Sequence, residues 1–217
     1  MLHTIPLGIV SSTAAAYLIE QSLLFNDGDS AYLNRTPSTA GNRKTWTFSV
    51  WVKRGKLTSD YYDIFSAGPS GDRLELRFDP NGDIRCYMDV ASVRVLDRIT
   101  TAYFNDPSAW YHVVVAIDTT NATAADRMKI YVNGSRITAF STETSLAGSA
   151  NADGPVNNTT DHLIGTRSAL NQYFDGLMAL PILVDGAALA PTAFGETDGD
   201  GFWNPIEFVP DTVGSNL

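Results

Sequence analysis

Alternation of apolar and polar side chains predicts β-strands along most of this chain. Residues 46–52 show it most clearly, because the side chains on one face are Trp46, Phe48, Val50 and Val52. Residues 74–78 and 127–132 repeat the period of two. A period of two places successive side chains on opposite faces of a pleated strand, so each segment predicts a strand with one apolar face.

A long hairpin is predicted between residues 110 and 134, with two antiparallel strands at the centre of a sheet. The turn signals Asp79-Pro-Asn-Gly-Asp83 and Asn133-Gly134 connect neighbouring strands, because Asn and Gly tolerate the φ values of tight hairpins. Only residues 189–194 suggest a helical turn, with Pro191 in its first turn. The predicted strands are residues 17–25, 31–35, 46–52, 62–66, 74–78, 84–90, 93–99, 110–117, 127–132, 137–141, 163–166 and 173–184.

This pattern predicts an all-β fold, a two-sheet antiparallel jelly-roll sandwich. Trp110-Tyr-His-Val-Val-Val followed by Lys129-Ile-Tyr-Val-Asn-Gly134 resembles the central hairpin of laminin-G-like, concanavalin A-like lectin-glucanase domains. His162-Leu-Ile-Gly165 and Tyr173-Phe-Asp-Gly176 resemble the closing strands of that family. The resemblance implies that the first and late strands pair at one edge, which would bring the chain ends together.

Four further phrases resemble bacteriophage virion proteins that carry this domain. The resemblance implies a particle component, such as a head decoration, head fibre or tail-associated protein. It covers roughly residues 17 to 208. The phrases are Ile19-Glu-Gln-Ser-Leu-Leu-Phe-Asn-Asp27, Gly41-Asn-Arg-Lys-Thr-Trp-Thr47, Asp106-Pro-Ser-Ala-Trp-Tyr-His112 and Phe194-Gly-Glu-Thr-Asp198.

Three parts are expected: an N-terminal arm over residues 1–16, the sandwich over 17–208 and a C-terminal tail over 209–217. The arm has no secondary-structure period and lacks the basic start of a secretion signal. Residues 145–160 are rich in Gly, Ala, Ser and Asn and predict a long, partner-facing loop. The arm is unusually apolar for a free terminus, so two states are expected: a flexible arm, or an arm ordered by docking on a partner. The residues expected to make the attachment are Leu2, Ile5, Leu7, Ile9 and Val10.

Composition narrows the classes of partner. The net charge is −9 and the pI about 4.6, which argues against a nucleic-acid face, because phosphate binding needs clustered Lys and Arg. No apolar run is long enough to span a bilayer. The single cysteine, Cys86, is expected to be a buried thiol, and the absence of disulfides fits assembly in the bacterial cytoplasm.

The sequence offers little for catalysis. Glycosidases need two carboxyl groups about 5–9.5 Å apart, and glucan-cleaving relatives carry them as Glu-x-Asp-x-x-Glu on one strand. None of the five glutamates starts that pattern, and Glu75 between Leu74 and Leu76 is interpreted as a solvated carboxylate. His112 is interpreted as a hydrogen-bonded structural histidine. We therefore expect no enzymatic activity and no required cofactor.

Two kinds of binding site are considered. Glu196, Asp198, Asp200 and Glu207 have the spacing of a calcium loop, although the first ligand is Glu rather than Asp and the flanks are not helices. Asp-Gly-Asp-Gly is also ordinary turn composition. The candidates for stacking on sugar rings are Tyr61, Tyr62 and Tyr173, which are expected at strand ends or in loops.

The favoured hypothesis is a non-enzymatic phage virion structural protein that displays a lectin-like sandwich on the particle. Its expected partners are capsid or tail proteins and further copies of itself, as a trimer or dimer. The alternative is a carbohydrate-binding adhesin module that holds the phage to host or environmental glycans, and a glycan-cleaving enzyme is the third reading.

Overall fold

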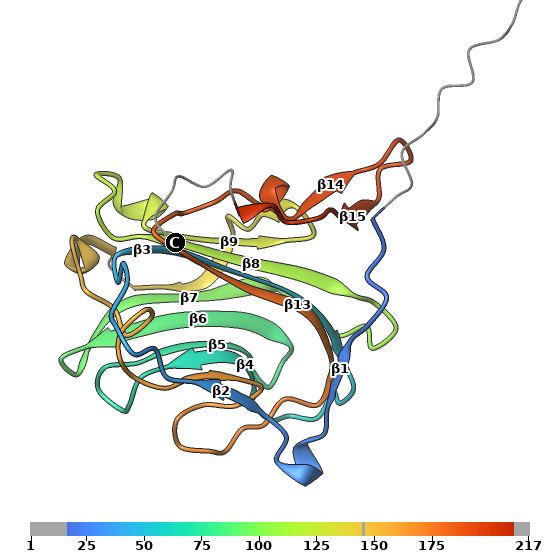
Figure 1. Cartoon of the computed structure of the whole chain (residues 1–217), viewed down its shortest axis with the longest axis horizontal. Helices are drawn as coiled ribbons and strands as arrows, with labels where there is room; N and C mark the ends of the chain where they lie inside the picture. Colours follow the sequence, from blue (N-terminus) through green and yellow to red (C-terminus); the bar gives the residue numbers. More distant parts are fainter. Residues whose placement is uncertain (1–16, 145, 211–217) are drawn as a thin grey trace, which may run out of the picture.

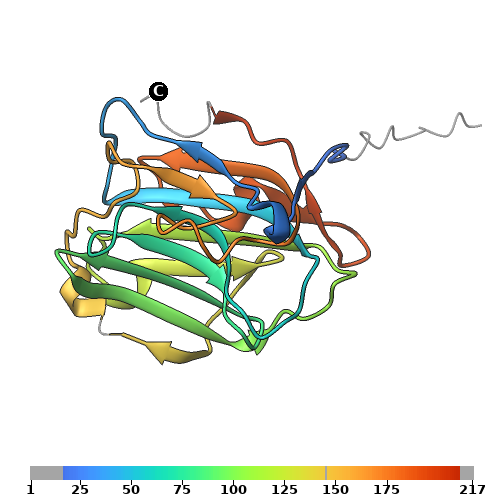
Figure 2. The same ribbon diagram turned by 90° about the horizontal axis from the view of Figure 1, so that it is seen from below.

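A computed structural model describes residues 17–144 and 146–210, and they form two stacked antiparallel sheets (Figures 1 and 2). The all-β sandwich expected from the sequence is therefore confirmed. The six-stranded sheet has the order β1 (Leu23–Phe25), β13 (Gly176–Asp185), β3 (Thr45–Arg54), β8 (Tyr111–Asp118), β9 (Met128–Val132) and β10 (Ser135–Arg136).

The seven-stranded sheet packs against the first, and every strand pairing among the described residues is antiparallel. Its order is β11 (Phe140–Glu143), β7 (Val93–Tyr103), β6 (Asp83–Val90), β5 (Leu74–Phe78), β4 (Tyr62–Ala67), β12 (His162–Ile164) and β2 (Leu33–Arg35). The short 3-10 helices are η1 (Asp27–Asp29), η2 (Ala124–Asp126), η3 (Leu146–Ser149) and η4 (Pro191–Ala193).

The core lies between the sheets and is built from the alternating positions. On β3 the inward side chains Trp46, Phe48 and Val50 are at most 1 % exposed, and Phe48 stacks on Phe65 of β4 at 4.3 Å between ring centroids. Burying such side chains contributes about 1.5–3 kcal/mol each, so this layer supplies most of the driving force for folding. No helix in the described ranges is long and apolar enough to cross a membrane.

The predicted hairpins are confirmed. β8 pairs with β9, and Asn133 and Gly134 at the following turn have φ of 47° and 76°, the left-handed values that this turn requires. β5 pairs with β6 across residues 79–83. The centre of the six-stranded sheet is the β3–β8 pair, however, and β9 lies next to the edge.

A third layer, which the sequence did not predict, covers the six-stranded sheet. Strands β14 (Gly195–Thr197) and β15 (Trp203–Pro205) form a hairpin on the side of that sheet away from the seven-stranded one (Figure 1). Trp203 donates a hydrogen bond from Nε1 to Nδ1 of His112 at 2.9 Å. The outward faces of β3 and β8 are consequently buried too, which explains why residues 46–52 of β3 are buried on both faces of the sheet, including the polar Thr47 and Ser49.

The first strand is shorter than predicted. β1 pairs with the late strand β13, as expected, but only over residues 23–25. β13 is irregular between Ala179 and Ile182, where Leu180 has a φ of 46°, so residues 17–22 find no regular ladder. The described ends also separate, because the chain turns back after β15 and Phe208 stacks on Phe194 at 5.0 Å (Figure 1).

The predicted loop over residues 145–160 is only partly free. Gly154, Pro155, Val156 and Asn157 are buried, and Val156 is part of the main core. The backbone N–H of Asn157 donates to Nε2 of His162 at 2.9 Å. This half of the segment is therefore packed into the core rather than exposed as a partner-facing loop.

Candidate functional site

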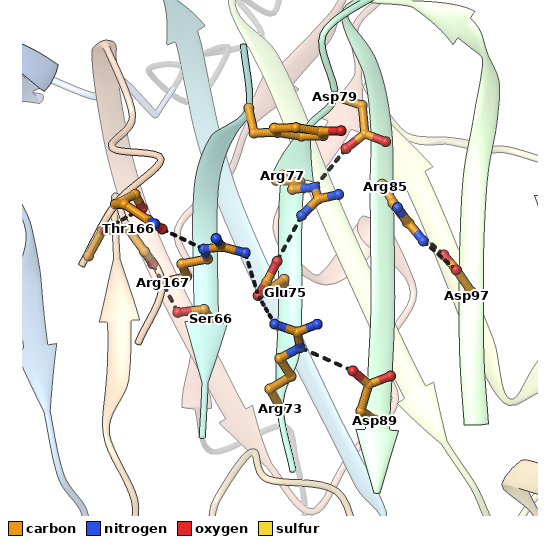
Figure 3. Close-up of polar contacts among 12 residues, drawn as sticks. Ser66, Arg73, Glu75, Arg77, Asp79, Arg85, Asp89, Asp97, Thr166 and Arg167 are labelled. Atoms are coloured by element: carbon orange, nitrogen blue, oxygen red, sulfur yellow. Dashed lines mark hydrogen bonds and ion pairs between the residues drawn. The ribbon is translucent and has the colours of Figure 1, made fainter. Parts of the chain in front are cut away.

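The outer face of the seven-stranded sheet, which points away from the core, carries a dense layer of charged side chains (Figure 3). It arises from alternation on β5, where Leu74, Leu76 and Phe78 enter the core while Glu75 and Arg77 point outward. We call this set the arginine layer. Its arginines are Arg73, Arg77, Arg85, Arg94 and Arg167, and its carboxylates are Glu75, Asp79, Asp89 and Asp97.

Glu75 is the centre of one half of the layer. Its carboxylate lies 2.9 Å from Nη1 of Arg77, 3.3 Å from Nη1 of Arg73 and 3.6 Å from Nη1 of Arg167. Arg167 belongs to the segment that follows β12, so it reaches Glu75 from outside the hairpin. The side chain of Glu75 is 2 % exposed, and the interpretation of this residue as a solvated carboxylate is wrong.

Asp97 and Asp89 organise the other half. Arg85 binds Asp97 in the two-pronged geometry typical of guanidinium and carboxylate, at 2.9 and 2.6 Å. Arg94 bridges the two carboxylates, with Nη1 2.8 Å from Asp97 and Nε on Asp89. Burial alone would raise the pKa of Asp89, but the bonds from Arg94 and Arg73 outweigh it and lower that pKa.

Tyr87 of β6 lies beneath the guanidinium groups. Four of them have their central carbon within 5.4 Å of its ring centroid, and Arg94 is closest at 3.8 Å. Guanidinium groups stack favourably on aromatic faces, so the ring holds them in place. Burial, together with a hydrogen bond to Glu75, raises the pKa of Tyr87.

The layer has an inner and an outer level. The side chains of Glu75, Asp97 and Asp89 are only 2 %, 6 % and 11 % exposed, whereas the four outer arginines are between 20 % and 29 % exposed. The carboxylates therefore lie below and the guanidinium groups meet solvent. Those arginines are Arg73, Arg85, Arg94 and Arg167.

One further carboxyl group, Asp63 of β4, lies in this region without any exposure. The backbone N–H of Asp63 donates to Gln172 O at 3.1 Å, so the segment after β12 covers it. Neither side-chain oxygen has a hydrogen-bond partner among residues 17–144 and 146–210. Burial and the nearby Glu75 raise the pKa of Asp63 well above its usual value.

An apolar pocket of about 280 Å³ lies on the other side of the sandwich, beside the start of the described chain. Trp51, Trp110 and Ala179 line it together with Pro205 and the segment 19–22. Leu18 and Leu24 on either side of that segment are each 72 % exposed, which leaves apolar surface unburied there.

The residues proposed for calcium are not gathered into a metal site. Asp198 instead shapes the β14–β15 turn, where it accepts bonds from the N–H groups of Asp200 and Phe202 and from Asn204 Nδ2. The backbone bond from Phe202 is the main reason that the pKa of Asp198 is lowered. Within the described ranges, no three His, Cys, Asp or Glu side chains, including Glu196 and Glu207, are placed to hold a metal ion together.

The three predicted tyrosines have different positions. Tyr62 is 3 % exposed and lies in the core, with its hydroxyl bonded to Thr58, so its assignment as a ligand-binding ring is wrong. Tyr61 is half-buried, with the guanidinium of Arg77 4.3 Å from its ring centroid. Tyr173 is also half-buried, with its ring 6.3 Å from that of Tyr32 at the rim.

His112 and Cys86 are structural, as the sequence suggested. His112 is fully buried between the rings of Trp51 and Trp203, and its Nε2 lies 2.9 Å from Ser49 Oγ. Burial lowers its pKa to about 4. Burial also raises the pKa of the Cys86 thiol, which makes this cysteine unreactive.

The proposed attachment residues Leu2, Ile5, Leu7, Ile9 and Val10 lie outside the described residues. The arginine layer itself was not predicted, although a signal was present: arginines and carboxylates alternate with core residues in 73–79, and Arg85, Tyr87 and Asp89 do so in 85–89. What the pattern does not show is that the two segments share one face.

A family model described as the concanavalin A-like lectin/glucanases superfamily, Laminin_G_3, matches residues 26–187. The chain belongs to this family, as the hairpin motif suggested. No curated protein sequence gives a significant match.

Solved structures share the fold at low identity. Tailspike protein 2 of Escherichia coli O157:H7 bacteriophage CAB120 is 12 % identical, with a TM-score of 0.54 over 80 % of this chain and 23 % of that one. A SAP-like pentraxin from Limulus polyphemus is 14 % identical, with a TM-score of 0.48 over 70 % and 68 %. Domain 4 of an extracellular arabinanase from Geobacillus stearothermophilus, solved with arabinotriose, is 18 % identical, with a TM-score of 0.48 over 70 % and 65 %.

Proposed function

We propose that this protein is a non-enzymatic structural component of a bacteriophage particle, attached to capsid or tail proteins through the surface around its N-terminal end. The four phrases that resemble phage virion proteins support this role. A phage tailspike also contains a domain of this fold, so phage particles do use such sandwiches. The proposed location is the virion, and the proposed assembly is a dimer or trimer.

One observation carries the proposal. The described chain begins at Tyr17, beside the pocket formed by Trp51 and Trp110, and the exposed Leu18 and Leu24 flank it. The 16 preceding residues contain no Asp, Glu, Lys or Arg. A sequence without these charged residues, directly before a segment that lines an apolar, tryptophan-lined pocket, has the composition expected of a buried contact with another protein.

The carboxylates support a binding role rather than a catalytic one. A glycosidase needs an acid that is accessible to its substrate. Here Asp63, whose pKa is raised well above its usual value, is fully buried, and Glu75 is held by three arginines beneath the surface. We propose that no required cofactor is bound, and calcium binding remains a prediction for a titration to test.

The test is incorporation into particles. Phage propagated with the gene for a chain lacking residues 1–16, or carrying Leu18→Ser and Leu24→Ser, should assemble particles with a strongly reduced copy number of this protein. Gly199→Ala, at the tip of the β14–β15 hairpin where an added Cβ meets nothing within 4 Å, serves as the folded control. Normal occupancy of both altered chains would contradict attachment through this end.

A second candidate function, glycan binding, is favoured by the arginine layer. Charged donors on one face of a lectin-like sandwich are suited to the oxygens of a saccharide. A glycan array with the whole protein, with and without calcium, tests it. The two functions use opposite faces of the sandwich and are compatible.

A further inference from the structure

We infer that the arginine layer binds glycans that carry oxyanions, namely carboxylated or sulfated polysaccharides, rather than neutral ones. The inference rests on the glycan-binding candidate function and narrows its ligand class. Five of the 15 Lys and Arg residues of an otherwise acidic chain meet on this one face.

The face is much less acidic than the chain as a whole. Five guanidinium groups face five carboxylates, because Asp83 of β6 alternates with the core residue Ile84 and interacts with Arg77 and Arg85. These ten charges cancel, in a protein whose net charge is −9. Because the carboxylates lie in the lower level, a ligand at the surface meets guanidinium groups first.

The arginines of the layer keep some hydrogen-bond donors free for a ligand. Each arginine has five N–H donors, and the carboxylates use only part of them. In the described part of the chain, no hydrogen-bond partner is found for Nη2 of Arg73, Nη1 of Arg85 or Nη2 of Arg167. Guanidinium donors bind oxyanions most strongly, because two oxygens of one carboxylate or of a tetrahedral oxyanion can accept two parallel bonds.

The guanidinium groups of the layer are preorganised for binding. The ring of Tyr87 and the buried carboxylates hold Arg73, Arg85 and Arg94 in fixed positions, so little side-chain entropy is lost when a ligand binds. All three guanidinium groups lie within 5.2 Å of one ring centroid, close enough for one acidic saccharide to contact several. Half-buried Tyr61 beside them offers ring surface to a sugar.

The experiment measures binding of the full chain to polygalacturonate, which carries carboxylates, to dextran sulfate, which carries sulfates, and to neutral dextran. We expect binding to at least one polyanion, weakened by added salt, and none to dextran. If only one binds, the oxyanion that the layer selects is identified; if both bind, the common oxyanion chemistry is sufficient.

The variant removes a pair of charges together, because removal of Arg94 alone would leave the covered carboxylates of Asp89 and Asp97 with one arginine partner each. Arg94→Gln with Asp89→Asn should weaken polyanion binding about tenfold or more, the loss expected for one charge-assisted contact. The matched control, Arg136→Gln with Asp126→Asn, removes an exposed 2.6 Å ion pair on the six-stranded sheet and should leave binding unchanged.

Three other outcomes would overturn the inference. Equal binding to dextran and the polyanions would keep the glycan-binding function and reject the oxyanion class. Polyanion binding that both double variants leave unchanged would place the site elsewhere. No binding to any of the three glycans would reject both the inference and the glycan-binding function. If the double variant fails to fold, the salt dependence of binding by the natural protein and its preference for polyanions over dextran still test the inference.

Discussion

Two side chains in this fold have pKa values that differ from their usual ones, and the reason is burial. Asp63 and His112 are both fully buried, one as a carboxyl group with a raised pKa and the other as a neutral imidazole with a lowered one. Both are costly to ionise where they lie. They therefore make opposite contributions to the pH dependence of stability.

Replacing Asp63 should stabilise the protein at neutral pH. Asp63→Asn keeps the shape and removes a group whose raised folded pKa favours the folded state only at low pH. The stability that such a group contributes at low pH is lost as the pH rises above 3.8, the usual pKa of this carboxyl group in an unfolded chain. We expect a gain of about 1–3 kcal/mol at pH 7 that disappears below pH 4, measured by urea unfolding. A loss of stability at pH 7 would mean that the buried charge is needed.

His112 should make the fold sensitive to mild acid. The indole N–H of Trp203 only donates, so Nδ1 of His112 must accept and the ring must be neutral. Its pKa is lowered from 6.5 to about 4, so stability is fully present above pH 6.5 and falls as the pH drops toward 4, by about 3 kcal/mol. Urea unfolding at pH 7, 5 and 4 measures this fall.

The variant comparison isolates the histidine. His112→Gln has no proton to bind in this range, so its stability should lose this part of the slope between pH 6.5 and 4. If the natural protein and the variant show the same slope, another group carries the pH dependence.

At the scale of elements, the β14–β15 hairpin is the feature that closes the six-stranded sheet. Trp203 fits against glycines: an added Cβ at Gly195 would lie 2.6 Å from its ring. That approach is closer than packed atoms tolerate, so the ring or the strand has to move.

Gly195→Ala should therefore loosen the hairpin and destabilise the protein by about 1–3 kcal/mol. Gly199→Ala in the same hairpin is the matched control, since nothing lies within 4 Å of its added Cβ, and it should change stability by less than about 0.5 kcal/mol. Thermal unfolding followed by tryptophan fluorescence measures both. Equal effects would show that Trp203 packing does not hold the hairpin.

The elements that the sequence predicted are those with a local signal. Alternation located β3 and β5, and turn chemistry located the hairpins at residues 79–83 and 133–134. The signal failed for residues 17–22, because strand formation there depends on whether the distant β13 stays regular. The sequence did not predict β14 and β15, because their turn, rich in Asp and Gly, also has the spacing of a calcium loop.

The candidate site was harder to predict than the fold. The charge alternation around Glu75 was visible, but its burial depends on Arg73, Arg77 and Arg167, and Arg167 comes from a segment more than 90 residues further along the chain. Tyr62 was assigned to the surface because it was expected at the end of a strand. Register with β5 instead places it opposite Phe78 in the core.

At the scale of the whole molecule, the two outer faces have opposite character. The side that carries the N-terminal end presents the tryptophan-lined pocket and the exposed Leu18 and Leu24. The side formed by the seven-stranded sheet presents the guanidinium groups of the arginine layer. The proposed function assigns attachment to the first side and ligand binding to the second.

A density map of the intact particle tests this account most directly, because it shows which face of the sandwich touches the particle. The account predicts that residues 17–24 and the pocket of Trp51 and Trp110 lie against a particle protein, while Arg73, Arg85 and Arg94 face solvent. A map in which the arginine layer is buried against the particle and the N-terminal end is free would contradict it.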